Sequence, residues 1–379
     1  MIVYPVKHSP LLRQPEHFIA RDELKTLIKK VTHNLVNIHD ETGEFLLRLD
    51  DGRVIDTKGW AGWEWTHGVG LYGMYQYYLQ TGDETMSDII DCWFADRFAE
   101  GATTKNVNTM APFLTLAYRY EETRNPAYLP WLDSWAEWAM HEMPRTKFGG
   151  MQHITLAEEN HQQMWDDTLM MTVLPLAKIG KLLNRPDYIE EATYQFLLHV
   201  QNLMDKETGL WFHGWSYEGN HNFANARWAR GNSWLTIVIP DFLELLDLPE
   251  NNSVHRYLVQ VLNAQIAALA KCQDESGLWH TLLDDPQSYL EASATAGFAY
   301  GILKAVRKRY VGQEYALVAE KAIRGIVQHI SPEGELLHTS FGTGMGHNLD
   351  FYRNIPRTSM PYGQAMAMLC LTEYLRKYF

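Results

Sequence analysis

The sequence predicts an all-α protein folded as an (α/α)6 barrel, a closed ring of six helix hairpins that forms a single domain. Three observations predict this fold: a glycine loop recurs, apolar helices alternate with amphipathic ones, and short connections alternate with long ones. The barrel spans residues 22–379, after an N-terminal extension of residues 1–21. An open solenoid is the alternative, but six units with a strongly apolar inner set favour closure.

The recurring loop is clearest in segments 41–45, 207–211 and 275–279, which read ETGEF, ETGLW and ESGLW. Including weaker matches, glycines spaced 49 to 68 residues apart mark the repeat: Gly43, Gly101, Gly150, Gly209, Gly277 and Gly334. Such a period indicates repetition of one supersecondary unit.

Two kinds of helix alternate along the chain. In segment 187–203, Tyr188, Ala192 and Phe196 fall on one apolar stripe, as in a surface helix. Segments such as 169–179 are apolar on every side, which predicts a buried helix. The twelve predicted helices are 22–39, 67–81, 84–98, 107–123, 126–143, 164–183, 186–203, 228–247, 253–272, 290–310, 314–330 and 359–377.

The connections give the direction of the ring. Tight turns containing glycine or proline, such as 81–83 and 184–186, follow the buried helices. Long loops carrying the repeated glycine follow the surface helices. All long loops then lie at one end, where the buried helices begin, and we expect the functional site there.

Composition excludes several classes of function. The 379 residues are 46% hydrophobic and 21% charged, as in a soluble globular protein, and the net charge of −13 disfavours nucleic acid and anionic membranes as partners. No apolar run reaches membrane-spanning length, and residues 1–10 lack a signal-peptide core, so a cytoplasmic location is expected. Cys92, Cys272 and Cys370 lie far apart and are expected to be buried thiols.

The segment 164–171 is the strongest candidate for chemistry. Trp165 precedes Asp166 and Asp167 where a long polar loop meets an apolar helix. A tryptophan face beside a carboxyl group is typical of a sugar site, with a platform for the ring and an acid for the bond. The alternative is a helix cap, because aspartate is favoured at helix starts.

Arg230 is the candidate carboxylate clamp. Its guanidinium is planar and always charged, and the neighbouring Trp228 and Trp234 could orient it. A structural salt bridge to Asp166 or Glu291 is the alternative role, and both roles can hold together.

No metal or other cofactor is expected. Histidines 67, 153, 161 and 213 lack the helical spacing of metal ligands. The glycine-rich segment 342–346 is followed by no lysine motif, so it predicts tight turns near a ligand rather than a phosphate loop.

Three motifs, at 164–167, 209–213 and 228–234, resemble those of the unsaturated rhamnogalacturonyl hydrolases, glycoside hydrolase family 105, which are related to the unsaturated glucuronyl hydrolases of family 88. The resemblance runs from about residue 22 to the end of the chain. It implies an (α/α)6 barrel that removes the 4,5-unsaturated uronic acid left by a polysaccharide lyase. It also implies a distinctive route, in which C4 is protonated, water adds at C5, and the hemiketal collapses.

The resemblance also assigns roles to residues. It makes Asp167 the acid/base residue, whose pKa would be lowered by a helix N-terminus and raised by burial against Trp165 and by Asp166. It implies substrate-binding roles for a set of side chains around the barrel mouth: Trp65, Asn108, Trp165, His213, Arg230 and Trp234. Asn108 stands where several family members have a second aspartate, which leaves Asp167 as the only acid/base candidate from the sequence.

Two other functions fit the same barrel. Sugar 2-epimerases share it but use paired histidines at the mouth, where this chain has Trp165, Asp166 and Asp167. A non-catalytic sugar-binding protein would tolerate loss of the Asp167 carboxylate. Nothing in the sequence indicates the oligomeric state.

Overall fold

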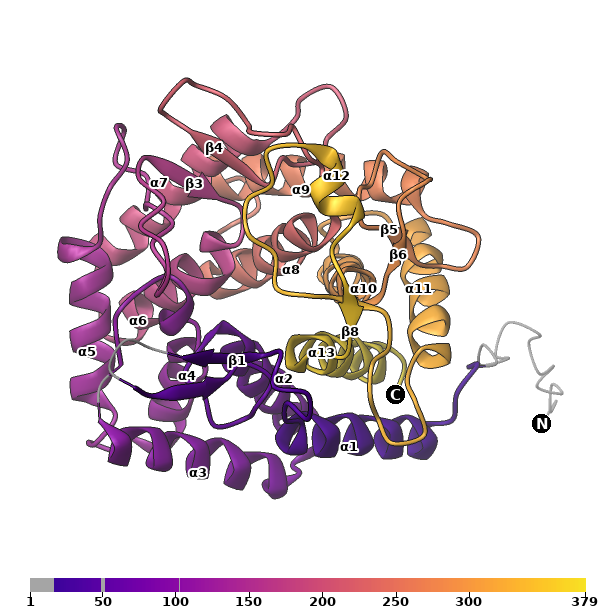
Figure 1. The fold of residues 1–379 in the computed structure, drawn as a ribbon, viewed down its shortest axis with the longest axis horizontal. Coiled ribbons are helices and arrows are strands. Elements are labelled where there is room, and N and C mark those ends of the chain that lie inside the picture. Colours follow the sequence, from indigo (N-terminus) through magenta and orange to yellow (C-terminus); the bar gives the residue numbers. More distant parts are fainter. Residues whose placement is uncertain (1–16, 49–51, 102) are drawn as a thin grey trace, which may run out of the picture.

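A computed structural model describes residues 17–48, 52–101 and 103–379. Most of the predicted N-terminal extension, including the segment 1–10, lies outside these residues. Viewed down its shortest axis, the molecule is a ring of helices inside a second ring (Figure 1). None of the helices in the described part of the chain has the length and apolarity that a membrane span requires.

Inner and outer helices alternate along the chain, as predicted. The inner helices are α2 (Trp65–Thr81), α4 (Phe113–Thr123), α6 (Leu174–Leu182), α8 (Ala229–Leu246), α10 (Ala292–Arg307) and α13 (Pro361–Tyr378). The outer helices are α1 (Arg21–Asn37), α3 (Glu84–Glu100), α5 (Leu129–Glu137), α7 (Pro186–Leu203), α9 (Ser253–Cys272) and α11 (Ala316–Gln328).

The inner ring is closed. Each inner helix packs against the next one along the chain, and the last, α13, packs against the first, α2. The first outer helix, α1, also lies against α13. These contacts between the two ends of the chain exclude the open solenoid.

Burial explains why the two kinds of helix separate. Every residue of α10 from Ala292 to Val306 is buried, and the helix is rich in alanine and glycine, which lets its neighbours approach closely. The outer helix α11 buries only one stripe, which includes Ala319, Ala322, Ile323 and Ile326. This three-to-four-residue spacing places its apolar face on the inner ring.

Three of the repeated glycines have a common structural cause. Gly209, Gly277 and Gly334 have φ of 86°, 94° and 90°, in the left-handed region. A Cβ on each would lie 2.6, 2.4 and 2.3 Å from a backbone carbonyl oxygen of α9, α11 and α1, respectively. Each glycine therefore lets the loop after one outer helix pack against the backbone of the next, and the last contact closes the outer ring.

Short antiparallel strand pairs tie the long loops together at one end of the ring. In the described residues they are β1 (Leu46–Arg48) with β2 (Val54–Asp56), β3 (Gln163–Trp165) with β4 (Gly214–Ser216), β5 (Trp279–His280) with β6 (Leu290–Glu291), and β7 (Thr339–Ser340) with β8 (Arg357–Thr358). Short helical turns complete the fold: η2 (Asn108–Met110), η3 (Trp138–Glu142), η4 (Leu169–Val173), η5 (Gln313–Tyr315) and α12 (Leu349–Arg353).

Three predictions were wrong in detail. The helix predicted at 164–183 begins as strand β3, because Trp165 pairs with Gly214 of the next repeat, and then continues through η4 into α6. The helix α12 was not predicted. Cys92 is exposed, because it lies on the outward side of α3, and Cys272 is only partly buried, whereas Cys370 is buried as expected.

A buried ion pair closes the other end of the barrel. Nζ of Lys304 lies 2.5 Å from Oδ1 of Asp241, and both side chains are almost completely buried. The hydroxyl groups of Tyr72 and Tyr300 also donate to this carboxylate, at 3.0 and 2.8 Å. The network joins α2, α8 and α10 across the ring, at the end opposite the long loops.

Candidate active site

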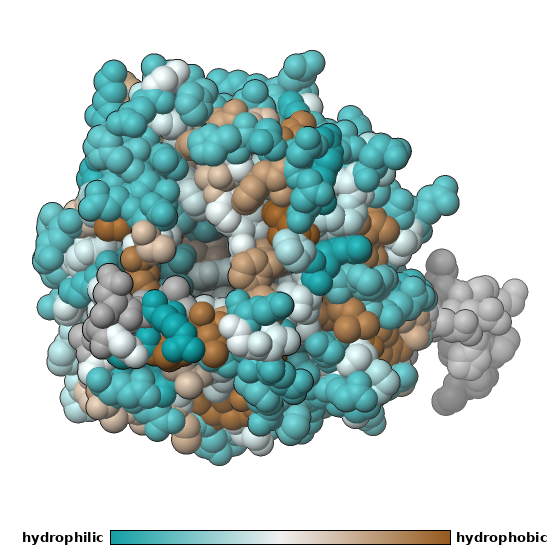
Figure 2. All heavy atoms as spheres, viewed as in Figure 1, coloured by the Kyte–Doolittle hydropathy of each residue, from teal (hydrophilic) through white to brown (hydrophobic). Residues whose placement is uncertain are grey.

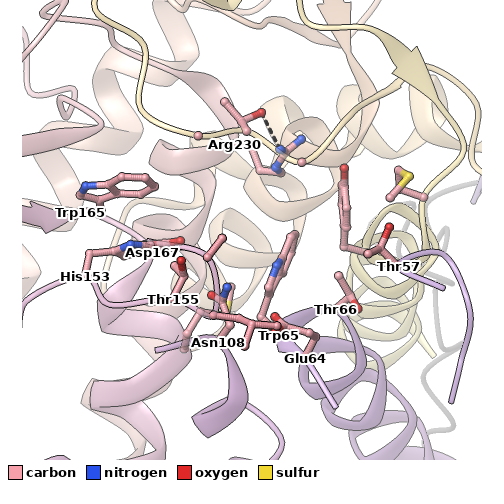
Figure 3. Close-up of a pocket in the computed structure, with 18 of the residues that line it drawn as sticks. Thr57, Glu64, Trp65, Thr66, Asn108, His153, Thr155, Trp165, Asp167 and Arg230 are labelled. Carbon is pink, nitrogen blue, oxygen red and sulfur yellow. Dashed lines mark hydrogen bonds and ion pairs between the residues drawn. The ribbon is translucent and has the colours of Figure 1, made fainter. Parts of the chain in front are cut away.

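A cavity of about 390 Å³ opens where the inner helices begin. The space-filling view shows this face hollowed near its centre, beneath a mostly hydrophilic rim (Figure 2). Six of the predicted site residues line the cavity: Trp65, Asn108, Trp165, Asp167, Arg230 and Trp234. The close-up shows five of them, all but Trp234, labelled around it (Figure 3).

A strand pair positions Asp167. Trp165 ends β3 opposite Gly214, and the N–H of Asp166 donates to the carbonyl oxygen of His213 at 3.0 Å. The chain then turns into η4, whose N-cap is Thr168 and has no side-chain capping bond. The helix-cap role predicted as the alternative for the two aspartates is therefore not seen.

His153 is the closest polar partner of Asp167. Its ring stacks on Trp165, with centroids 3.9 Å apart and planes 11° from parallel. Nε2 lies 2.9 Å from Oδ1 of Asp167. Burial acts to raise the pKa of Asp167, but His153, followed by His213 and His199, outweighs it and leaves that pKa below its ordinary value. Asp167 is thus ionised at neutral pH.

Asp166 has the opposite protonation state. Its side chain is fully buried and does not line the cavity. Burial, and secondarily the charge on Asp167, raises its pKa well above the ordinary value. Oδ2 packs against Gly231, where a Cβ would lie only 2.0 Å away. The two adjacent carboxyl groups are therefore one neutral and one charged.

Arg230 is held between two aromatic rings. Its guanidinium carbon lies 4.7 Å from the ring centroid of Trp228 and 4.8 Å from that of Tyr362. Tyr362, rather than the predicted Trp234, is thus the second flanking ring. The guanidinium donates to Ser340, to the carbonyl oxygen of Phe341 at 3.0 Å and to Oγ1 of Thr343 at 3.0 Å.

Arg230 does not form the salt bridge to Asp166 or Glu291 that was the alternative role for it. Within the described ranges, no carboxylate lies at ion-pair distance from its guanidinium. Glu291 instead accepts from Ser293, Ala294 and the N–H of Ser340. The buried positive charge of Arg230 is therefore hydrogen-bonded but not neutralised, which suits an anionic ligand.

Aromatic side chains form another wall. Trp65 stacks on Tyr362, with centroids 4.6 Å apart, and meets Trp234 edge-on at 5.7 Å. Such faces can pack against the C–H groups of a sugar ring while leaving its hydroxyl groups to polar partners. Tyr362 is a site residue that the sequence motifs did not indicate.

Asn108 also lines the cavity. The side chain of Asn106 accepts from the N–H groups of Asn108 and Thr109, at 2.9 and 3.1 Å, and so fixes the turn that begins η2. Glu64 also lines the cavity. Burial raises the pKa of Glu64 to about 7.

His213 is the exception among the predicted substrate-binding residues. It is buried behind Trp165, with ring centroids 5.3 Å apart, and does not line the cavity. Its Nδ1 lies 2.8 Å from the hydroxyl oxygen of Tyr352. Because β4 follows it directly, the loop that carries it turns it inward, where it packs against Trp165 and Trp228.

Comparison with known proteins agrees with this geometry. Glycosyl Hydrolase Family 88 matches residues 37–378. The unsaturated rhamnogalacturonyl hydrolase YesR of Bacillus subtilis (strain 168) is 31% identical over 317 residues, which cover 83% of this chain and 90% of YesR.

Two solved structures are more similar still. A possible member of the GH105 family from Salmonella enterica serovar Paratyphi A is 92% identical, with a TM-score of 0.97 over 100% of both chains. A possible member of the same family from Klebsiella pneumoniae is 86% identical, with a TM-score of 0.97 over 100% of both chains. The resemblance found in the sequence is confirmed: this chain is a glycoside hydrolase, it belongs to Glycosyl Hydrolase Family 88, and it is a homologue of YesR.

Proposed function

We propose that this enzyme removes a 4,5-unsaturated uronic acid from the non-reducing end of oligosaccharides that polysaccharide lyases produce, with rhamnogalacturonan fragments as its substrates. The observation that carries the proposal is the ionised Asp167 in an aromatic-walled cavity that also holds an unneutralised arginine. A sugar ring needs the aromatic faces, and a uronate needs the cation. The similarity to YesR supports the same substrate class.

Arg230 accounts for selection of an acidic sugar. Its charge lies in the cavity wall without a carboxylate partner among the described residues, and the neighbouring Asp166 is kept neutral by burial. A uronate carboxylate would supply the missing negative charge. Thr343, whose hydroxyl oxygen accepts from Arg230, also lines the cavity beside it.

Hydration of the C4=C5 bond fits the carboxylate at the centre of the site. The Asp167 carboxylate, held by His153 on one side, can take a proton from the water that adds to C5. Addition of a proton at C4 and of hydroxide at C5 gives a hemiketal. Its collapse opens the ring to a ketone at C5, and the hemiacetal left at C1 releases the next sugar as an alcohol.

The test is turnover of an unsaturated rhamnogalacturonan disaccharide by the purified protein. We expect loss of the ultraviolet absorbance of the conjugated C4=C5 bond, in step with release of the second sugar. The matched control is the same disaccharide with a saturated uronic acid, which offers no double bond and should not be cleaved. Cleavage of the saturated compound would contradict the hydration route.

A further inference from the structure

The guanidinium of Arg230 is held by one short segment of the long loop that follows α11. Its Nη1 donates to the carbonyl oxygen of Ser340 at 2.8 Å and to the hydroxyl oxygen of the same residue. Its Nη2 donates to Phe341 and Thr343. Thr343 lines the cavity, whereas Ser340 is buried and does not. Ser340 therefore anchors the guanidinium on the side away from the cavity, and the position of Ser340 determines the orientation of the charge.

Glu291 binds the same serine. Its Oε1 accepts the N–H of Ser340 at 2.8 Å. The carbonyl oxygen of Ser340 accepts from Arg230 and, at 2.6 Å, from the hydroxyl group of Tyr362. Glu291 is completely buried and does not line the cavity. A chain of hydrogen bonds thus joins a buried carboxyl group, through one serine, to the cation in the cavity wall.

Helix capping accounts for only part of this arrangement. Glu291 is the N-cap residue of α10, and its side chain accepts the N–H groups of Ser293 and Ala294, at 3.2 and 2.6 Å. A shorter side chain, such as that of aspartate, asparagine or serine, is the usual N-cap. The bond to Ser340, 49 residues further along the chain, lies outside the helix, and capping does not require it.

The closed ring brings the members of the network together. Arg230 lies in the first turn of α8, Glu291 immediately precedes α10, and Tyr362 lies in the first turn of α13. Ser340 ends β7, so it meets all three side chains at the end of the barrel where the inner helices begin. The network therefore joins the starts of three consecutive inner helices to the loop segment that holds Arg230.

An indirect connection suits the charge of Arg230 better than a direct one. In the part of the chain that the structure describes, neither Glu291 nor Arg230 forms an ion pair with a protein side chain. A carboxylate placed directly on the guanidinium would occupy its donors and compete with a uronate for them. Connection through Ser340 fixes the guanidinium and leaves its charge available to the ligand.

We infer that Glu291 is a positioning residue for substrate binding: by holding Ser340 it orients the guanidinium of Arg230 toward the carboxylate of the unsaturated uronate. The inference rests on the proposed function, which makes Arg230 the carboxylate-binding residue. It gives Glu291 no contact with the substrate and no part in proton transfer. Loss of the contact should therefore weaken the preference for a uronate over its uncharged ester.

The test measures, by calorimetry, the binding of an unsaturated rhamnogalacturonan disaccharide and of its methyl ester. The variant is Glu291→Asp, made in an Asp167→Asn background that prevents turnover. Aspartate can still cap α10, but its side chain is one methylene shorter and withdraws from Ser340. We expect the acid to bind about tenfold more weakly, the equivalent of about 1.4 kcal/mol of charge-assisted hydrogen bonding, and the ester to bind as before.

Asn252→Ala is the matched control for loss of a helix cap. Asn252 caps α9 by accepting the N–H groups of Val254 and His255, at 2.9 and 3.3 Å, and lies outside the cavity lining. Its loss should lower stability and leave the preference for the acid unchanged. A second control makes Glu291→Asp in an Arg230→Met background, where it should not change the preference further, because the effect passes through the guanidinium.

The outcomes separate this inference from the proposed function. A Glu291→Asp variant that keeps the original preference for the acid, or that binds acid and ester equally more weakly, would overturn the positioning role alone. Glu291→Asn replaces it if the aspartate variant does not fold, because asparagine caps helices equally well and buries no charge, and the same selective loss is expected. Absence of wild-type turnover on every unsaturated disaccharide would overturn the proposed function itself.

Discussion

Asp166 and Asp167 are adjacent in the sequence and opposite in chemistry. Asp166 faces Gly231 in the protein interior and stays neutral, whereas Asp167 reaches the cavity and meets His153. The difference comes from the turn between β3 and η4, which sends successive side chains to different surroundings. Environment rather than residue type therefore gives the two carboxyl groups opposite protonation states.

His153 should set the pH below which the enzyme loses activity. The histidine lowers the pKa of Asp167, and activity requires the ionised form, so His153→Asn should raise that pKa. The decline of kcat/KM at acidic pH should then begin at a higher pH. The control is His161→Asn, because His161 is exposed and pairs with Glu218 away from the cavity. An unmoved acidic decline would contradict this account.

At the scale of the element, the repeat loop is the unit that builds the barrel. The loops at Gly209, Gly277 and Gly334 each follow an outer helix, turn through a left-handed glycine and pack against the backbone of the next outer helix. Glycine is required at these positions for two reasons: the backbone has a positive φ, and a Cβ atom would clash with a backbone carbonyl oxygen of the next helix. This explains why the pattern E-T/S-G-L recurs at 207–210 and 275–278 although the helices around it differ.

Gly277→Ala should destabilise the protein more than an alanine substitution at a glycine that has a positive φ but no close neighbour. Gly277 has φ of 94°, and a Cβ would lie 2.4 Å from the carbonyl oxygen of Lys321. Gly82 has φ of 68° with nothing near its Cβ position, so Gly82→Ala is the matched control. We expect about 1–2 kcal/mol for Gly82→Ala from the left-handed backbone, and about 1–3 kcal/mol more for Gly277→Ala from the overpacking. Equal midpoints in urea unfolding would refute the close-approach argument.

At the scale of the whole molecule, the two ends of the ring differ in structure. The long-loop end holds the cavity, and the opposite end is closed by the buried pair of Lys304 and Asp241. A buried charge pair adds little net stability by itself, but it fixes which helices meet, because each charge needs the other. The pair therefore helps to hold the inner helices in the register that the cavity requires.

Lys304→Met should cost about 3–5 kcal/mol, because it leaves the buried Asp241 carboxylate without its cation. The double variant Lys304→Met with Asp241→Leu removes both charges and should recover much of that loss. Urea unfolding of the two variants and wild type gives the comparison. A double variant no more stable than Lys304→Met would show that the penalty does not come from the unpaired charge.

How much the sequence predicts depends on the range of the interaction. The helices and the ring follow from local periodicity and from the repeated glycine, and Asp167 and Arg230 lie where inner helices begin, so their positions could be inferred. The hydrogen bonds of Arg230 to a loop 110 residues away depend on the closed ring. No local pattern reports such contacts.

The positions of the histidines in the long loops could not be predicted from the sequence for the same reason. His153 and His213 both lie in loops at the mouth, and nothing in the sequence shows that the first reaches the cavity while the second turns inward. Strand pairing between consecutive repeats decides their directions. The chemistry of the site thus depends on packing between repeats more than on any single motif.

The most direct test of the central claim measures Asp167→Asn in two assays on the same unsaturated disaccharide, turnover by absorbance and binding by calorimetry. We predict that turnover falls at least about 10³-fold while binding is retained, because the amide preserves shape but cannot take a proton. Asp166→Asn is the matched control, since it replaces a carboxyl group that burial already keeps neutral, and it should retain turnover. Turnover by Asp167→Asn close to that of wild type would contradict the account.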